Sequence, residues 1–319
     1  MRFYLWLPVL ASLLCGCIPK DADRVMTLTE SSIYGAALSK DASMALISTE
    51  SGGVELWQLT PKSLKYRWRH GDSGNESIEL ALSDNGAFAA SLSRDSVALW
   101  RITDGAQVGW WSLPSPGHAI AVANQGSLLI GLVDGSVMSL VAGQTKLIRF
   151  LGHKEKVNSV ALSADGKLAL SGGNDYRAIL WQATSGQPLH EQDFDARVLK
   201  VALSSDGELA FAADAKADAR IFAADNGKMI SHLQIKQRSM TFSASRFTGD
   251  NQMLLTGTPF REVFSWQTKD GKLADRWQVS LATHPQIKGA VVYSVAETTL
   301  PSPIVSISSS GRVEYWSQR

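Results

Sequence analysis

Cysteine is almost absent from this chain of 319 residues, which has only Cys15 and Cys17. Both lie close to the amino terminus, so the rest of the chain has no disulfide and no thiol for chemistry. Proline is also scarce, with 10 residues, and no Pro- or Ser-rich stretch divides the chain. We therefore expect a single domain that is stabilised by packing.

Neither sign of charge is in excess. The chain has 31 lysines and arginines against 30 aspartates and glutamates, and its first sixteen residues hold one basic residue, Arg2, and no acidic one. The remainder thus carries 31 − 1 = 30 basic and 30 acidic side chains, which argues against a nucleic-acid partner. With 45% hydrophobic and 19% charged residues, the composition is that of a globular chain, not a disordered one.

What the sequence does contain is a repeat. Seven short β-rich runs end in a large apolar residue, with steps of 43, 40, 41, 41, 44 and 50 residues, at Trp57, Trp100, Leu140, Trp181, Phe222, Trp266 and Trp316. The residues before them alternate with period two, as in Val54-Glu55-Leu56-Trp57, which is typical of a strand. A period of about 40 to 45 residues with four strands per repeat predicts a β-propeller.

Two turns accompany this strand in most repeats. Asp165-Gly166 is an example of the turn that stands fourteen or fifteen residues before the closing residue. The second turn has a glycine five residues after the closing residue, at Gly105, Gly186, Gly227 and Gly271. Such turns favour tight hairpins because glycine adopts a positive φ without strain. Two hairpins per repeat predict a blade of four antiparallel strands.

The fourth repeat carries a family signature. It contains, in order, Gly152-His153, Ser171, Asp175 and Leu180-Trp181. This stretch resembles a WD40 repeat, and the resemblance extends in weaker form over residues 24–319; Gly117-His118 is the only other Gly-His pair near the expected place. The resemblance implies an all-β, seven-bladed WD40-type propeller. It also implies that His153, Ser171, Asp175 and Trp181 form a structural hydrogen-bond network.

The two ends of the chain predict how the ring closes. The last repeat stops at Trp316, directly after its third strand, while Arg24–Thr29 precedes the first complete repeat and has no hairpin partner. In the family the N-terminal strand completes the last blade. The resemblance implies the same closure here, which would leave no inner sheet edge unpaired.

A processing segment precedes that strand. The apolar run from Phe3 to Leu14 suits a signal peptide and is too short to span a bilayer. Leu14-Cys15-Gly16-Cys17 resembles the lipobox of bacterial lipoproteins, which implies cleavage before Cys17 and attachment of acyl chains to it. An ordinary secretory signal is the alternative. The expected domains are a signal peptide at 1–16, a lipidated tether at 17–23 and a propeller at 24–319.

The residue after Cys17 bears on location. Ile18 stands where an aspartate would retain the protein at the inner membrane, so the resemblance implies the bacterial outer membrane, with the propeller facing the periplasm. The residues up to Asp23 reach about 20 Å, and the face opposite the tether would carry the partner-facing loops. Candidate partner-facing residues on those loops are Lys154, Lys156, Tyr176, Arg177, Phe260 and Arg261.

Adjacent aromatic residues add a second candidate surface. Trp110 and Trp111 are neighbours on an expected outer strand, so their side chains point to opposite sides. One indole is expected to pack between blades, and the other is a candidate contact for a partner or for lipid headgroups. Ordinary packing is the alternative for this pair, and a loop that caps its own blade is the alternative for Phe260-Arg261.

Three residues of the fourth repeat also have the composition of a catalytic triad. We interpret His153, Ser171 and Asp175 as structural, because the resemblance assigns these positions to the network and the sequence contains no nucleophile elbow, phosphate loop or HExxH motif. The histidines, at 70, 118, 153, 190, 232 and 284, lack metal-ligand spacing. We predict no catalytic residue, metal or cofactor.

Two functions from different classes remain open. The first is a lipid-anchored, non-enzymatic protein-interaction scaffold of the bacterial cell envelope, which is attached to the membrane through its acyl chains and holds an envelope protein. The second is a periplasmic enzyme or small-ligand-binding propeller that uses an axial pocket. The second would need polar groups that converge on the axis, and the sequence does not reveal them.

Overall fold

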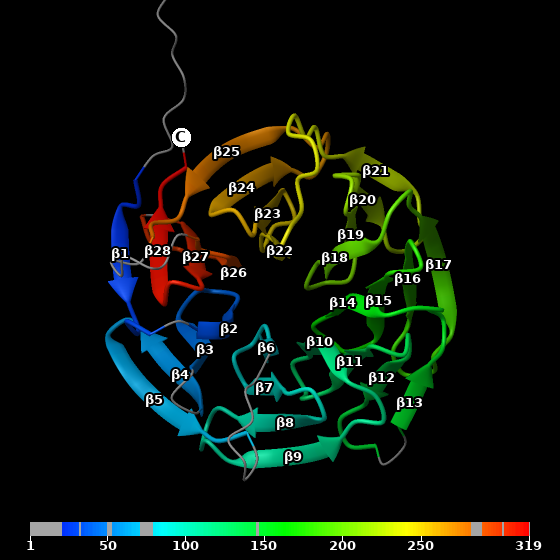
Figure 1. The fold of residues 1–319 in the computed structure, drawn as a ribbon, viewed down its shortest axis with the longest axis horizontal. Coiled ribbons are helices and arrows are strands. Elements are labelled where there is room, and N and C mark those ends of the chain that lie inside the picture. The colour runs from blue at the N-terminus through cyan, green and yellow to red at the C-terminus, as the bar shows by residue number, and fades with distance from the viewer. Residues whose placement is uncertain are drawn as a thin grey trace, which may run out of the picture.

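The computed structural model describes residues 21–31, 33–49, 53–70, 79–144, 147–281, 289–301 and 303–318. Seven four-stranded antiparallel sheets surround a central axis (Figure 1), which confirms the predicted seven-bladed all-β propeller. Across these ranges no helix is long and apolar enough to cross a membrane. The predictions for the signal peptide, the lipobox and Cys17 concern residues outside the described ones.

The strands are named by their position in each blade, from the axis outward. The inner strands (a) are β2 Ile33–Leu38, β6 Glu79–Leu82, β10 Gly117–Val122, β14 Val157–Leu162, β18 Val198–Leu203, β22 Ala244–Phe247 and β26 Val292–Glu297. The second strands (b) are β3 Met44–Thr49, β7 Phe88–Leu92, β11 Leu128–Leu132, β15 Leu168–Gly173, β19 Leu209–Asp214, β23 Met253–Gly257 and β27 Ile304–Ser308. The third strands (c) are β4 Gly53–Leu59, β8 Ser96–Arg101, β12 Val137–Leu140, β16 Arg177–Gln182, β20 Ala219–Ala223, β24 Glu262–Gln267 and β28 Arg312–Trp316. The outer strands (d) of blades 1 to 6 are β5 Lys62–Trp68, β9 Gln107–Ser112, β13 Leu147–Phe150, β17 Pro188–Asp193, β21 Met229–His232 and β25 Leu273–Gln278, and that of blade 7 is β1 Arg24–Thr27.

The core lies between neighbouring blades. Both faces of the middle strands are covered, so every residue of β3 is buried, whereas most residues of the outer strand β5 are exposed. Leu170 and Leu180 of blade 4, for example, share a buried cluster with Ala210 and Phe222 of blade 5. Each sheet therefore depends on its neighbours to cover its apolar faces, as expected for a repeat fold.

Five of the turns that join strands a and b share one hydrogen-bond pattern. A serine or threonine hydroxyl donates to the Asp or Asn side chain two residues later and accepts a hydrogen bond from the backbone N–H five residues later. The pairs are Ser39/Asp41, Ser83/Asn85, Ser163/Asp165, Ser204/Asp206 and Thr248/Asp250. These local bonds fix the hairpins that the repeated turn residues predict.

The N-terminal strand closes the ring as predicted. Arg24 of β1 lies opposite Tyr315 of β28, and the backbone N–H of Asp23 donates to the carbonyl of Tyr315 at 2.9 Å. The Asp23 carboxylate accepts a 2.6 Å hydrogen bond from the backbone N–H of Ser317. Met26 and Leu28 are each 7% exposed and pack in a cluster that includes Tyr315. The first described residues and the last strand thus form one sheet.

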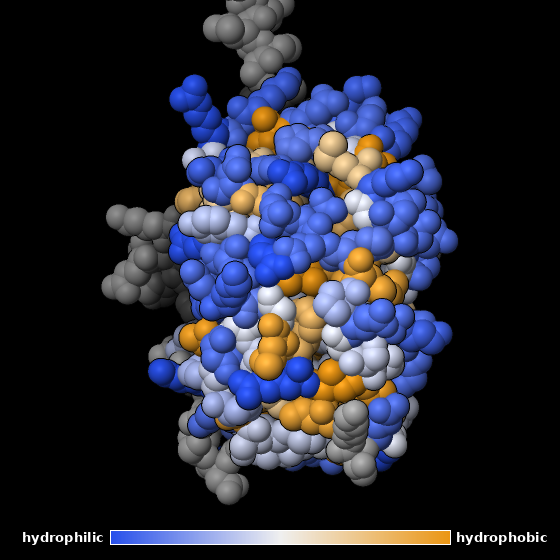
Figure 2. Space-filling model, turned by 90° about the vertical axis from the view of Figure 1, so that its right-hand side faces the viewer, coloured by the Kyte–Doolittle hydropathy of each residue, from blue (hydrophilic) through white to orange (hydrophobic). Residues whose placement is uncertain are grey.

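Loop connections define two faces of the ring. The top face carries the connections from strand d to the next strand a and those from b to c, and the bottom face carries the a–b and c–d turns. Because β1 is a d strand, it begins toward the bottom face. The outer wall seen in Figure 2 is largely hydrophilic and shows hydrophobic residues in separate patches, so this side presents no continuous apolar surface.

Candidate interaction surfaces

The four residues of the predicted network lie together in blade 4. His153 Nδ1 is 2.9 Å from Asp175 Oδ1, and His153 Nε2 is 2.8 Å from Ser171 Oγ. The indole N–H of Trp181 donates to Ser171 Oγ at 3.3 Å. The ring of Trp181 is fully buried and stacks on Phe150 with centroids 4.3 Å apart. Because Ser171 is 0% exposed, its hydroxyl cannot reach a substrate in this arrangement, which favours the structural interpretation.

Blade 2 contains a second histidine of this kind, which the sequence interpretation missed. His70 Nδ1 lies 2.8 Å from Ser91 Oγ, and that hydroxyl also accepts the indole N–H of Trp100 at 3.1 Å. The sequence does place His70 before a serine, Ser91, and a closing tryptophan, Trp100. It lacks the Gly-His pair of the fourth repeat, because Arg69 precedes His70. The Gly-His pair that did attract notice, Gly117-His118, begins strand β10 and does not occupy this position.

Acidification is expected to destabilise the ring through His70. Burial lowers the pKa of His70 from 6.5 to about 4, so the unfolded chain binds a proton at a higher pH than the folded one. The free energy of unfolding is therefore unaffected by His70 above pH 6.5. It falls by about 3 kcal/mol as the pH drops from 6.5 to about 4, because protons then bind the unfolded chain preferentially. His70→Gln should flatten the dependence of the free energy of unfolding on pH in this range, as measured by denaturant titration.

The matched control for this experiment is His232→Gln, because the His232 side chain is 52% exposed. This variant should keep the slope of the wild-type protein. An unchanged slope in the His70 variant would show that another group causes the loss of stability in acid.

The top-face loops of blade 4 hold four of the predicted partner-facing residues. Tyr176 is 50% exposed and has a left-handed backbone, with φ of 68°. Arg177 forms an ion pair with Glu191 and donates to the carbonyl of Gly152 at 3.2 Å. Lys154 is exposed, and the Lys156 ammonium lies 3.2 Å from His118 Nε2. Tyr176 and Lys154 are therefore accessible on the top face, whereas the side chains of Lys156 and Arg177 are engaged by neighbouring groups.

In each of the two remaining candidate pairs, Phe260-Arg261 and Trp110-Trp111, one side chain is exposed and the other contacts the protein. Phe260 is 70% exposed on the top face of blade 6, whereas the Arg261 guanidinium donates two hydrogen bonds to the carbonyl of Val279. Trp110 is 37% exposed and lies beside His70, with ring centroids 4.7 Å apart. Trp111 packs between blades 2 and 3 against a buried cluster. Phe260 and Trp110 are the accessible aromatic groups of these pairs.

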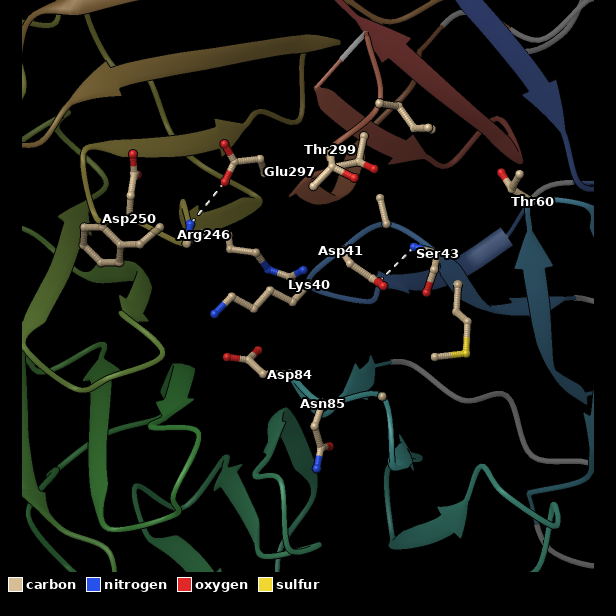
Figure 3. A pocket seen from close by; sticks show the side chains of 17 residues that line it. Lys40, Asp41, Ser43, Thr60, Asp84, Asn85, Arg246, Asp250, Glu297 and Thr299 are labelled. Carbon is tan, nitrogen blue, oxygen red and sulfur yellow. Dashed lines mark hydrogen bonds between the residues drawn. The ribbon is translucent and has the colours of Figure 1, made fainter.

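A charged pocket occupies the bottom mouth of the axis. Its volume is about 860 Å³, and Figure 3 shows side chains from several blades around it. Its charged lining residues are Lys40, Asp41, Asp84, Arg246, Asp250 and Glu297. This convergence could not be predicted from the sequence, because the residues come from separate a–b turns and strand ends.

Hydrogen bonds cross the axis at this mouth. The Arg246 guanidinium of blade 6 donates to the carbonyls of Leu38 and Ser39 in blade 1, both at 3.0 Å. Ser205 of blade 5 donates to the carboxylate of Asp84 in blade 2. Neither pair joins adjacent blades, so these contacts brace the ring across its centre.

Charged groups also lie deeper along the axis. Glu79 is exposed to the axial cavity, yet the loss of bulk water between the surrounding inner strands raises the pKa of its carboxyl group, an effect that the nearby Lys200 opposes. Burial lowers the pKa of Lys200, which Glu79 in turn opposes. Glu79 and Lys200, which carry opposite charges, both line a cavity of about 200 Å³. Among the described residues, no group of three or more His, Cys, Asp or Glu side chains could hold a metal ion.

Comparison with known proteins agrees with the geometry of blade 4. Residues 144–182 match the WD domain, G-beta repeat family. A 45-residue stretch is 47% identical to the small ribosomal subunit protein RACK1y of Oryza sativa subsp. japonica. That match covers 14% of this chain and 13% of the rice protein.

The whole ring is similar to a solved structure. A chain in the crystal structure of the mitotic checkpoint complex superposes with a TM-score of 0.74 over 99% of this chain and 98% of that one. The two sequences are 15% identical, so the likeness concerns the fold alone. The repeat signature and the ring together support a WD40-type propeller.

Proposed function

We propose that this protein is a non-enzymatic protein-interaction scaffold, anchored by lipid in the bacterial cell envelope. The observation that carries the proposal is the set of exposed apolar side chains on the loops of a rigid ring. Tyr176 of blade 4 and Phe260 of blade 6 are 50% and 70% exposed on the top face, and Leu151, in the connection that precedes strand a of blade 4, is 71% exposed. Exposed aromatic groups on a rigid support are well suited to anchor a protein partner.

The assemblies to which similar proteins belong support a role in assemblies for this chain. One is named as a protein of the small ribosomal subunit, and the other comes from a checkpoint complex. A ribosomal subunit and a checkpoint complex are both assemblies of several components. We extend to this chain only the general role of holding a protein partner.

The anchor is the second part of the proposal. The lipobox-like Leu14-Cys15-Gly16-Cys17 supports acylation of Cys17, and Ile18 supports sorting to the outer membrane. Asp23 is already bonded to β28, so the tether between Cys17 and the ring spans about 20 Å at most. Because β1 begins toward the bottom face, that face lies nearer the membrane and the top face points into the periplasm.

Photo-crosslinking in the envelope tests both parts. A photoreactive amino acid at Tyr176 or Phe260 is expected to yield crosslinks to a protein, whereas the same group at the exposed Lys228 of a bottom-face turn should not give that product. Cys17→Ser should move the protein from the membrane fraction to the soluble fraction. Crosslinks that reach only lipid from the top face, or a Cys17→Ser protein that stays in the membrane, would contradict the respective part.

The bottom-mouth pocket favours a second candidate function, a small-ligand-binding protein of the periplasm. Arg246 and Lys40 converge there with several carboxylates (Figure 3), which is the arrangement that the sequence did not reveal. Tight binding of a periplasmic metabolite by the purified ring, lost in Lys40→Gln, would support this role over the scaffold.

A further inference from the structure

Two charged side chains occupy the same position of the inner strand in different blades. Glu79 of β6 in blade 2 lies opposite Leu92 of β7. Lys200 of β18 in blade 5 lies opposite Ala213 of β19, which is the equivalent residue of its strand b. The other five blades carry a small residue here, at Gly35, Ala119, Ser159, Ala244 and Ser294. A carboxylate and an ammonium are therefore the two long side chains among seven equivalent positions.

These two charges face one another across the axis. Blades 2 and 5 are three places apart in a ring of seven, which is as far apart as two of its blades can be (Figure 1). Glu79 and Lys200 both line the axial cavity, and each acts on the other as an attracting charge. Neither group forms a hydrogen bond or an ion pair with another residue that the structure describes. The cavity thus separates two opposite charges that do not touch.

The other titratable groups of the cavity are already engaged. Arg246 and Asp84, which also line the bottom-mouth pocket (Figure 3), attract one another. The Arg246 guanidinium donates to two carbonyls of blade 1, and the Asp84 carboxylate accepts a hydrogen bond from blade 5. Burial raises the pKa of Tyr293, so its hydroxyl stays protonated and donates to the carbonyl of Ile33 at 3.3 Å. The charged lining holds two acidic and two basic groups and is balanced as a whole.

The cavity disfavours both of the charges that lack contacts. The loss of bulk water raises the pKa of the Glu79 carboxyl group and lowers the pKa of the Lys200 ammonium. A counter-ion that makes direct hydrogen bonds would stabilise each charged form. A simple anion would be repelled by Glu79, and a simple cation by Lys200. A molecule with an ammonium at one end and a carboxylate at the other satisfies both groups, and its zero net charge matches the balanced lining.

The size of the cavity limits the ligand further. Its volume of about 200 Å³ lies below the roughly 300 to 1,000 Å³ of pockets for drug-sized molecules, so it suits a compound as small as an amino acid. The small residues at the five remaining positions do not fill the space between the two charges. Asp84, Arg246 and Phe247 line both this cavity and the bottom-mouth pocket, so the two adjoin.

We propose that the axial cavity binds a small zwitterion, such as an amino acid, with its ammonium on the Glu79 carboxylate and its carboxylate on the Lys200 ammonium. This site is separate from the top-face loops of the proposed scaffold. The inference rests on the second candidate function, small-ligand binding, and specifies the place and the chemical class of the ligand.

Calorimetric titration of the purified full-length protein with a series of ω-amino acids, from glycine to ε-aminocaproate, tests the inference. These probes carry the same two charges at increasing separation. Binding should be tightest at one chain length, at which both ends reach their partners in the cavity. The alkylamine and the carboxylate of that length each lack one charge and should bind about tenfold more weakly.

Charge variants locate the binding. Glu79→Gln and Lys200→Gln should each weaken binding of the best probe by about tenfold. The double variant Glu79→Lys/Lys200→Glu should bind it again, because a zwitterion can bind turned end for end. The matched control Glu208→Gln/Lys228→Gln removes one exposed carboxylate and one exposed ammonium from bottom-face turns and should bind like the wild type.

The outcomes distinguish the axial site from the bottom mouth. Lys40→Gln should leave binding unchanged, and loss of binding in this variant would refute the axial site while supporting a ligand in the mouth. Equal binding of the amine alone, no dependence on chain length, or unchanged binding in either single variant would also overturn the inference. Because the length series uses the wild-type protein, it decides the question even where a variant fails to fold. Absence of binding by every probe would refute the zwitterion site, whereas the crosslinks from Tyr176 and Phe260 test the scaffold separately.

Discussion

A variant that lacks residues 1–30 is expected to be less stable, by on the order of 5 kcal/mol, than one that lacks only residues 1–20. The larger deletion removes β1, and with it the burial of Met26 and Leu28 and the backbone pairing from Arg24 to Thr27. It also leaves β28 as an open edge in the last blade. Denaturant unfolding of the two variants measures the difference, and hydrogen exchange in Arg312–Trp316 locates it.

Complementation provides the control for this result. A synthetic peptide of residues 21–30, added to the larger deletion, should restore protection in β28 because it can re-form the same antiparallel pairing. Equal stability of the two deletions would show that β1 adds nothing to closure. Recovery with a scrambled peptide would show that the effect is not specific to this strand.

Ser171→Ala is expected to cost about 2–4 kcal/mol of stability, because it leaves two buried groups without a hydrogen-bond partner, His153 Nε2 and the Trp181 indole N–H. Equivalent positions in other blades provide a graded series. Thr256→Val in blade 6 removes the acceptor of one group, the Trp266 indole N–H, and should cost less. Denaturant unfolding of the single variants measures all of these values.

Blade 7 supplies the matched control of that series. Ser306 is fully buried, and its hydroxyl makes no hydrogen bond with any described residue. Ser306→Ala removes the same atoms without separating a pair, so its effect should be within about 0.5 kcal/mol. Equal costs at all three positions would show that lost packing decides the result instead of the hydrogen bonds.

The fold was predictable because its signal repeats. The closing residues recur at nearly constant spacing, and their strands all occupy the third position of a blade. Closure was predictable because Arg24–Thr29 had no hairpin partner in the sequence. The blade 4 geometry was predictable because His153, Ser171, Asp175 and Trp181 are all present in the order of one well-known repeat.

Features that depend on several blades at once were not predictable. His70 stands 21 residues before its serine, compared with 18 for His153, and no glycine precedes it. Arg246 reaches blade 1 across the axis, over a separation of 208 residues from Leu38, which no local pattern encodes. Sequence periodicity describes one blade, whereas these contacts depend on how blades face one another.

The pairing of β1 with β28 also fixes a sequence of events in biosynthesis. Ribosomes make residues 24–27 before blades 1 to 6, whereas their partners, residues 312–315, are made only after those blades. Blades 1 to 6 can each form from contiguous chain as it emerges, but the seventh must wait for the final strand. Until then the exposed edge of β1 and the side chains of Met26 and Leu28 have no cover, so the nascent chain passes through an aggregation-prone stage that holdase chaperones are suited to protect.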